Sequence, residues 1–234
     1  MVRGNEFELH SVIDKVGKPV DLAEWGMTPP TVNAYYSPSR NEIVFHAGIL
    51  QPPFFDPKAD AAVNYGAIGA VIGHEMTHGF DDQGRKYDAD GNLRDWWTQQ
   101  DGAEFEKRAA CIANEYSGFT WMNDVTLNGK LTLGENTADN GGVRVAYMAL
   151  EEALNGKSDK VDAFTPEQRL FLGFAQMWCE NVSPQEARNR SMTDPHSPGR
   201  FRVNGTLQNM PEFQKAFSCK AGQPMVSANA CRVW

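Results

Sequence analysis

The segment Val71-Ile-Gly-His-Glu-Met-Thr-His78 contains the pattern His-Glu-x-x-His. In a helix, His74 and His78 would lie on one face, about 6 Å apart along the axis. Both imidazoles could then reach a single Zn²⁺ at about 2.0–2.1 Å. Glu75 is rotated by about 100° from His74, so it could accept a proton from a zinc-bound water without binding the metal itself. Two histidines that only pack or cap on a buried helix would give the same pattern.

The residues around this motif predict a helix over residues 60–79. Asp60 is a suitable N-cap and Gly79 a suitable C-cap. Residues at steps of three and four, which share one face, are Val63, Ala67, Val71, His74 and His78. Glycines lower helix propensity, so their presence in this stretch indicates that another element packs closely against the helix. They are Gly66, Gly69 and Gly73.

The rest of the chain is mostly helical by pattern. Two short strands are expected at 31–36 and 41–45, joined by a turn into a β-hairpin. Further helices are expected at 98–116, 135–154, 165–179 and 211–217. Pattern alone therefore predicts a mostly helical domain with a small sheet near its start.

Composition excludes several classes of protein. The chain has 234 residues, 41% of them hydrophobic, which is enough to bury a core and rules out general disorder. Its 22 Lys and Arg against 30 Asp and Glu give a net charge of −8, which argues against a nucleic-acid partner. There is no run of 18 apolar residues, so we expect no membrane segment in this chain. Four cysteines are too few for a disulfide scaffold.

A catalytic zinc needs a third protein ligand and an open fourth position. Metzincins continue the motif with His-x-x-Gly-x-x-His, but here the corresponding positions are Asp81 and Gly84, which excludes that class. Downstream, Glu135 and Asp139 are four residues apart near the start of an expected helix. Glu135 could bind the metal while Asp139 orients a ligand histidine. A solvated helix face, favoured by the helix dipole, would give the same two carboxylates.

Seven separate stretches resemble the neprilysin family, which includes the endothelin-converting enzymes and bacterial endopeptidases of the PepO type. They occur in family order from about residue 20 to the end: VNAYY at 32–36, NEIVF at 41–45, AGILQPPFF at 47–55, HEMTHGFDD at 74–82, GENTAD at 134–139, HSPGRFR at 196–202 and CRVW at 231–234. One departure is His46, where the family usually has proline. We expect a structural role for His46 and no contact with metal.

The resemblance implies a thermolysin-like gluzincin fold of α+β class, predominantly helical, with residues 1–234 as a single catalytic domain from the C-terminal portion of a longer protein. It implies one Zn²⁺ per chain, bound by His74, His78 and Glu135. Glu75 would be the general base. The family aspartate at Asp139 is often described as a proton donor; its spacing from Glu135 favours orienting a ligand histidine instead, and Asp81 would do the same for the other histidine.

The resemblance also implies how substrate is held. His196 corresponds to the histidine that stabilises the oxyanion, and Arg202 to the arginine that holds substrate carbonyls or a C-terminal carboxylate. Asn33 and Ala34 would bind peptide backbone, with the hairpin edge accepting the substrate as an added strand. The apolar S1′ wall would include Phe54, Val71 and Trp178.

These features predict a zinc endopeptidase that works by zinc-activated water with Glu75 as base, and the resemblance implies that it hydrolyses short peptides on the amino side of hydrophobic residues. The alternative is a zinc- and peptide-binding module with little turnover, because an N-terminal region expected to cover the site lies outside this chain. By resemblance, Cys111 pairs with Cys231, which fits an extracytoplasmic location. Cys179 and Cys219 would then be free, unless they pair with each other.

Overall fold

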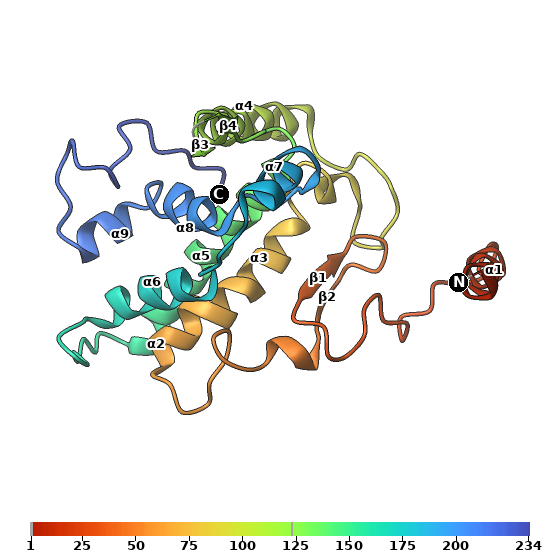
Figure 1. Cartoon of the computed structure of the whole chain (residues 1–234), viewed down its shortest axis with the longest axis horizontal. Coiled ribbons are helices and arrows are strands. Elements are labelled where there is room, and N and C mark those ends of the chain that lie inside the picture. The colour runs from red at the N-terminus through yellow and green to blue at the C-terminus, as the bar shows by residue number, and fades with distance from the viewer. Residues whose placement is uncertain (1, 123) are drawn as a thin grey trace.

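The structure is a computed structural model that describes residues 2–122 and 124–234. Most of the ordered elements are helices, and the strands form two separate two-stranded sheets. This confirms the predominantly helical α+β fold (Figure 1). The helices are α1 Val2–Ile13, α2 Ala61–Asn64, α3 Ala70–His78, α4 Gln99–Ser117, α5 Leu133–Leu154, α6 Pro166–Met177, α7 Pro184–Thr193, α8 Gly199–Leu207 and α9 Pro211–Ala216. Short 3₁₀ turns occupy Ala47–Ile49 and Gly84–Lys86.

The expected hairpin near the start of the chain is present. It pairs β1, Ala34–Ser37, with β2, Glu42–Phe45, in an antiparallel register that places Ala34 opposite Phe45. Asn41 supports the turn with a φ of 49°, a backbone conformation that asparagine tolerates better than most residues. A second antiparallel pair joins β3, Thr120–Met122, to β4, Val125–Thr126. Sequence patterns did not predict this second pair.

The helix expected over residues 60–79 is divided into three parts. Asp60 caps its start, because Asp60 Oδ1 accepts a hydrogen bond from the backbone N–H of Ala62 at 3.0 Å. Between α2 and α3, a π-helical stretch, Tyr65–Gly69, widens the helix locally. The motif histidines then lie in α3, as expected.

Two glycines allow other helices to pack closely against this segment. A Cβ atom on Gly73 would lie 2.6 Å from the carbonyl oxygen of Gly142 in α5, and one on Gly66 would lie 1.9 Å from that of Leu170 in α6. Only glycine fits at such distances. The close crossing of α3 and α5 at Gly73 brings the first turn of α5 to the side of the motif histidines.

Three helices lie where sequence patterns predicted none. Helix α7 begins directly after Ser183, whose hydroxyl caps it, and α8 begins directly after Pro198. Helix α1 lies apart from the other helices in Figure 1, and its side chains Phe7 and Leu9 are exposed. Within residues 2–122 and 124–234, no helix is both long and apolar enough to cross a membrane.

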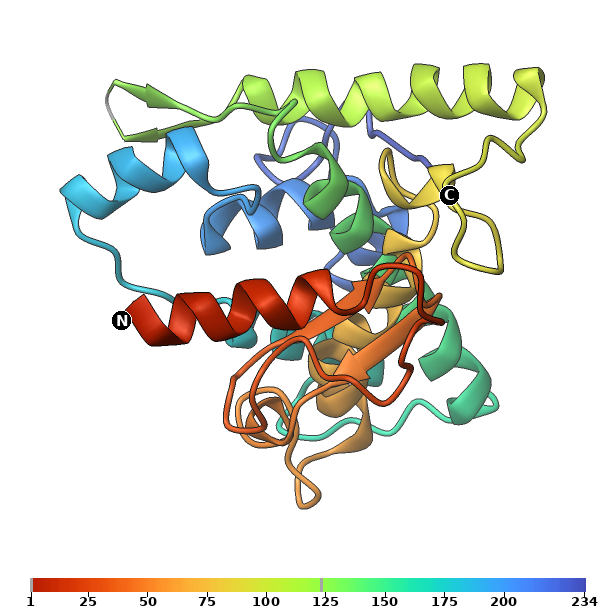
Figure 2. The ribbon, with the colours of Figure 1, turned by 90° about the vertical axis from the view of Figure 1, so that its right-hand side faces the viewer.

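Two hydrophobic clusters hold the helices together. The larger cluster joins α3, α5 and α6 and includes Val143, Leu170 and Phe174. The smaller cluster packs α4 against the end of the chain and includes Ile112, Tyr116 and Val233. Figure 2 shows α4 as a long helix along one edge of the molecule, away from the hairpin. The candidate site lies in the cavity between α3, α5 and the hairpin.

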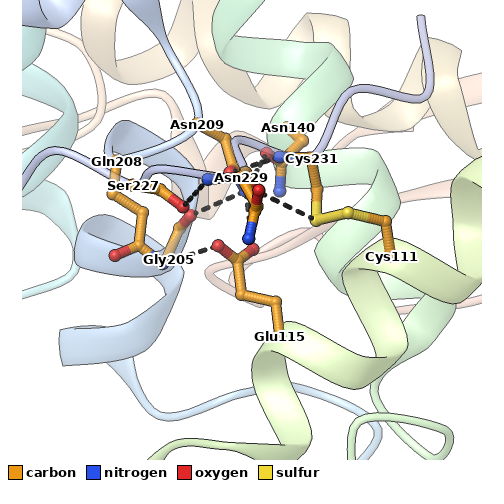
Figure 3. The surroundings of a disulfide bond; sticks show 9 residues. All are labelled: Cys111, Glu115, Asn140, Gly205, Gln208, Asn209, Ser227, Asn229 and Cys231. Carbon is orange, nitrogen blue, oxygen red and sulfur yellow. Dashed lines mark hydrogen bonds between the residues drawn. A yellow bond between two sulfur atoms is a disulfide. The ribbon is translucent and has the colours of Figure 1, made fainter.

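A disulfide between Cys111 and Cys231 ties α4 to the end of the chain, as the family resemblance implied. Asn209 lies beside it: its Oδ1 accepts a hydrogen bond from the backbone N–H of Cys231, and its Nδ2 donates to Glu115 Oε2, each at 2.7 Å (Figure 3). The disulfide and the hydrogen bonds of Asn209 together join α4, the residues just after α8 and the C-terminal tail. The other two cysteines, Cys179 and Cys219, are free.

We expect the Cys111→Ser, Cys231→Ser protein to lose about 2–5 kcal/mol of unfolding free energy. The bond closes a loop with a sequence separation of 120, and loss of a long loop constraint enlarges the unfolded ensemble. Urea denaturation measures the change. The matched control is Cys179→Ser, which removes an exposed cysteine that forms no disulfide. Equal stability of the double variant and the wild type would contradict the prediction.

Candidate metal centre and active site

Three side chains converge at the centre of the candidate site. The Nε2 atoms of His74 and His78 are 2.9 Å apart. Glu135, in the first turn of α5, places Oε2 3.3 Å from His74 Nε2 and Oε1 3.6 Å from His78 Nε2. Among the residues that the structure describes, these three form the group of ligand-type side chains able to hold a metal ion.

This arrangement fits a zinc ion. Ligand atoms bound at about 2.0–2.1 Å to a tetrahedral zinc lie about 3.3 Å from one another, close to the separations between the three side chains. Glu135 Oε2 is buried and has no hydrogen-bond partner among the described residues. A buried carboxylate oxygen without a partner is unfavourable, and a cation would satisfy it.

Two aspartates fix the orientation of the histidines. His74 Nδ1 is 2.8 Å from Asp139 Oδ1, and His78 Nδ1 is 2.7 Å from Asp81 Oδ2. Each carboxylate can accept a hydrogen bond from Nδ1–H, and a histidine that keeps its proton on Nδ1 has its lone pair on Nε2, directed at the metal position. Asp81 is held in turn by the backbone N–H groups of Gln83 and Gly84. Both aspartates therefore lie within hydrogen-bond distance of a histidine; their orienting role stays a prediction.

Arg202 forms a buried ion pair with Asp139. Its Nε donates to Asp139 Oδ2 and its Nη2 to Asp139 Oδ1, each at 2.7 Å. The two residues are only 6% and 2% exposed. The guanidinium also lies over the ring of Trp178, 3.7 Å from its centroid. Arg202, on α8, therefore supports the carboxylate that orients His74.

The electrostatics of the centre favour a proton or a cation between the three ligands. Burial lowers the pKa of His78, but the hydrogen bond to Asp81 and the carboxylate of Glu135 outweigh it and raise that pKa to about 10. Burial raises the pKa of Glu135, and the two histidines outweigh it and hold that pKa well below its usual range. A metal ion must displace protons here, so its affinity rises with pH.

Glu75 points into the same cavity but is not one of the three converging ligands. It is buried, and burial raises its pKa, partly opposed by the positive charge that His74 and His78 can carry. A carboxylate with a raised pKa beside a metal position is suited to accept and release a proton near neutral pH.

The predicted substrate residues surround this centre in one cavity of about 440 Å³. Asn33 and Ala34 line it from the start of the hairpin. The cavity wall also includes Phe54, Val71, Trp178, His196 and Arg202. The fold thus brings every predicted site residue to one place, although their roles in catalysis and substrate binding stay predictions.

His196 lies at the rim of the cavity. Its Nε2 is 3.3 Å from Glu135 Oε2, and its Nδ1 is 2.8 Å from Asp194 Oδ1. Asp194 also accepts a hydrogen bond from the backbone N–H of His196 at 2.9 Å. Sequence reasoning missed Asp194. Its signal was an aspartate two residues before a candidate histidine, a spacing at which the carboxylate can reach both the backbone and the ring.

His46 is fully buried directly after β2 and is not one of the converging ligands. Its Nδ1 is 3.0 Å from the backbone carbonyl oxygen of Asn33, and its ring packs edge-on against Trp25. This position fits the structural role expected for His46.

A family model described as Peptidase family M13 matches residues 33–233. The chain belongs to peptidase family M13. This M13 chain is 48% identical to Neprilysin-3 of Drosophila melanogaster and 47% identical to Endothelin-converting enzyme 1 of Homo sapiens. Both alignments cover 97% of the M13 chain. It spans only 30% of the length of either relative.

A solved structure of similar fold is the Mycobacterium tuberculosis zinc metalloprotease ZMP1 in complex with an inhibitor. The TM-score is 0.92 at 46% sequence identity, covering 97% of the M13 chain and 36% of ZMP1. These comparisons confirm both the resemblance to the neprilysin family and the gluzincin fold.

Proposed function

We propose that this chain is the catalytic portion of a zinc-dependent endopeptidase that hydrolyses short peptides on the amino side of hydrophobic residues. The observation that carries the proposal is the convergence of His74 Nε2, His78 Nε2 and Glu135 on one position, with Glu75 in the same cavity. His74, His78 and Glu135 would hold one Zn²⁺ per chain. When bound, zinc supplies Lewis-acid chemistry, polarising a peptide carbonyl and lowering the pKa of water.

The chain's own residues would carry out the proton transfers. Glu75 takes a proton from the attacking water and passes it to the leaving amine. His196 stabilises the negative charge that develops on the carbonyl oxygen, held in orientation by Asp194. Asp139 and Asp81 keep the two ligand histidines in the required tautomer.

Substrate would be bound by the cavity walls. The backbone of Asn33 and Ala34, at the start of β1, would accept the peptide as an added strand. Phe54, Val71 and Trp178 would form the apolar wall that favours hydrophobic residues. Arg202 Nη1 makes no hydrogen bond to any residue that the structure describes, which leaves it for a substrate carbonyl, while Nε and Nη2 hold Asp139.

The second candidate function is a zinc- and peptide-binding module with little turnover. It is favoured by one observation: the chain spans only 30% of the length of its curated relatives. An N-terminal region of a longer protein would then be needed to cover the cavity. The Cys111–Cys231 disulfide supports an extracytoplasmic location. A thiol titration that finds four reduced cysteines in the native protein would contradict that location.

A fluorogenic peptide assay with metal quantification separates these functions. If the chain is an endopeptidase, one zinc per chain and chelator-sensitive cleavage before hydrophobic residues are expected. Zinc and peptide binding without cleavage would favour the module. A chain that binds no zinc under saturating conditions would overturn both.

A further inference from the structure

The segment that carries His196 has no regular structure of its own. It runs from Asp194 to Pro198, between the end of α7 and the start of α8. Asp194 binds the backbone and ring of His196. Asp194 therefore orients the ring relative to its own segment, but something else must hold that segment relative to the cavity.

Arg190, in the last turn of α7, joins this segment to a second carboxylate, that of Glu180. Its Nε donates to Asp194 Oδ2 at 2.9 Å, and its Nη1 donates to Glu180 Oε2, also at 2.9 Å. Because Asp194 uses Oδ1 for His196 and Oδ2 for Arg190, each of its oxygens has a separate task. The guanidinium fork is a rigid connector between two carboxylates.

Glu180 connects the same network to the start of α8. Its Oε1 accepts a hydrogen bond from the backbone N–H of Gly199 at 2.6 Å, at the first residue of the helix that carries Arg202. A carboxylate at a helix N-terminus also interacts favourably with the helix dipole. Glu180 follows Trp178, a residue of the cavity wall, by two positions. Its carboxylate therefore connects this part of the wall to the His196 segment through Arg190, and to α8 through Gly199.

We propose that Arg190 and Glu180 are positioning residues that hold His196 and the start of α8 in the arrangement used for peptide hydrolysis. The expected effect on peptide hydrolysis rests on the proposed function, whereas the expected effect on the geometry of the His196 segment does not. The side chains of Arg190 and Glu180 are 25% and 32% exposed. A pair this accessible to water contributes little to global stability, so its effect is expected on the geometry of the segment.

The test compares Arg190→Ala with Arg188→Ala. Arg188 lies on the same helix and forms an ion pair with Asp124 at 2.7 Å, but Asp124 has no contact with the His196 segment among the described hydrogen bonds. The first measurement is amide hydrogen exchange at His196 and Gly199 in the full chain. Faster exchange at these two amides in Arg190→Ala, with no change in Arg188→Ala, supports the proposal. Unchanged exchange in Arg190→Ala overturns it.

The second measurement is steady-state peptide hydrolysis. Arg190→Ala should lower kcat by about tenfold and change KM by less than about twofold, because a small displacement of His196 affects the transition state more than substrate binding. Arg190→Lys, which can reach one carboxylate but not both at once, should recover part of the rate. Equal losses from Arg190→Ala and Arg188→Ala would overturn the proposal.

A double-mutant cycle shows whether Arg190 acts through His196. In a His196→Ala background, Arg190→Ala should cause little further loss of kcat. Additive losses would overturn the proposed route. If the wild-type chain does not hydrolyse peptides at all, the proposed function fails, and the hydrogen-exchange comparison still decides whether Arg190 holds the segment.

Discussion

The Glu75→Gln protein is expected to bind one zinc ion per chain and to hydrolyse peptides about 10²–10⁴ times more slowly than the wild type. Glu75 lies in the cavity beside the three ligands but outside the group that converges on the metal position. Glutamine has nearly the same shape and keeps one oxygen as an acceptor, but it cannot take up a proton. The substitution therefore removes the proposed base while leaving the metal ligands in place.

Zinc content by elemental analysis and kcat/KM for a fluorogenic peptide measure this effect together. Glu115→Gln is the matched control: Glu115 is a half-buried glutamate whose pKa, like that of Glu75, is raised by burial, but it lies near the disulfide, bound by Gln208 and Asn209. It should keep full activity. Full activity of Glu75→Gln with normal zinc content would exclude Glu75 as the base.

The Asp139→Asn protein is expected to lose about 10–100-fold in zinc affinity and about 3 kcal/mol of unfolding free energy. Asp139 accepts hydrogen bonds from His74 and from two nitrogens of Arg202. Asparagine carries no negative charge to balance the buried guanidinium of Arg202. Its NH₂ group, unlike a carboxylate oxygen, cannot accept a hydrogen bond from His74 Nδ1–H or from Arg202. One substitution should therefore weaken both metal binding and the packing of α8 on α5.

The pH dependence of stability gives an independent measurement of the same pair. Burial raises the pKa of Asp139, but Arg202 and His74 outweigh it and hold that pKa below its usual range. A carboxyl group with a lowered folded-state pKa stabilises the fold fully above its unfolded-state pKa of about 3.9, and this contribution is lost as the pH falls through the folded-state pKa. Asp139→Asn should remove that part of the acid-dependent loss.

The control for this substitution is Asp124→Asn, which breaks the exposed pair between Asp124 and Arg188. An ion pair in which both side chains are exposed contributes little to the free energy of unfolding, so no measurable change in stability or zinc affinity is expected. Urea denaturation in the presence of chelator separates the effect on the fold from the effect on the metal. If Asp139→Asn matches the wild type in both measurements, the orienting role of Asp139 is wrong.

Local sequence determined the part of the metal centre that lies within α3, namely the two histidine ligands. The spacing of His74 and His78 places both imidazoles on one face of α3, and Asp60 caps the segment as expected. The hairpin and the helices corresponding to α4, α5, α6 and α9 were also predicted, because their caps and apolar periodicity are local features. The assignment of roles to Glu135, His196 and Arg202 came from the ordered family motifs.

The helices that sequence patterns missed lack those local features. In α7, Ala187 is the buried residue of an otherwise polar helix, so it has no apolar stripe. Helix α8 contains Gly199 and Gly205, which lower helix propensity, and it is stable because Phe201 and Leu207 are buried against other helices. Tertiary packing outweighed local preference in both cases.

Only the tertiary structure decided how the two halves of the site meet. The close crossing of α3 and α5, which Gly73 and Gly142 permit, brings Glu135 and Asp139 to the histidines from about sixty residues further along the chain. The pairing of Asp139 with Arg202, and the network from Glu180 through Arg190 to Asp194, likewise join separate helices. The sequence by itself thus determined the ligand types and their spacing within α3, whereas contacts between distant segments determined the geometry of the complete centre, because no local pattern encodes which helix faces pack together.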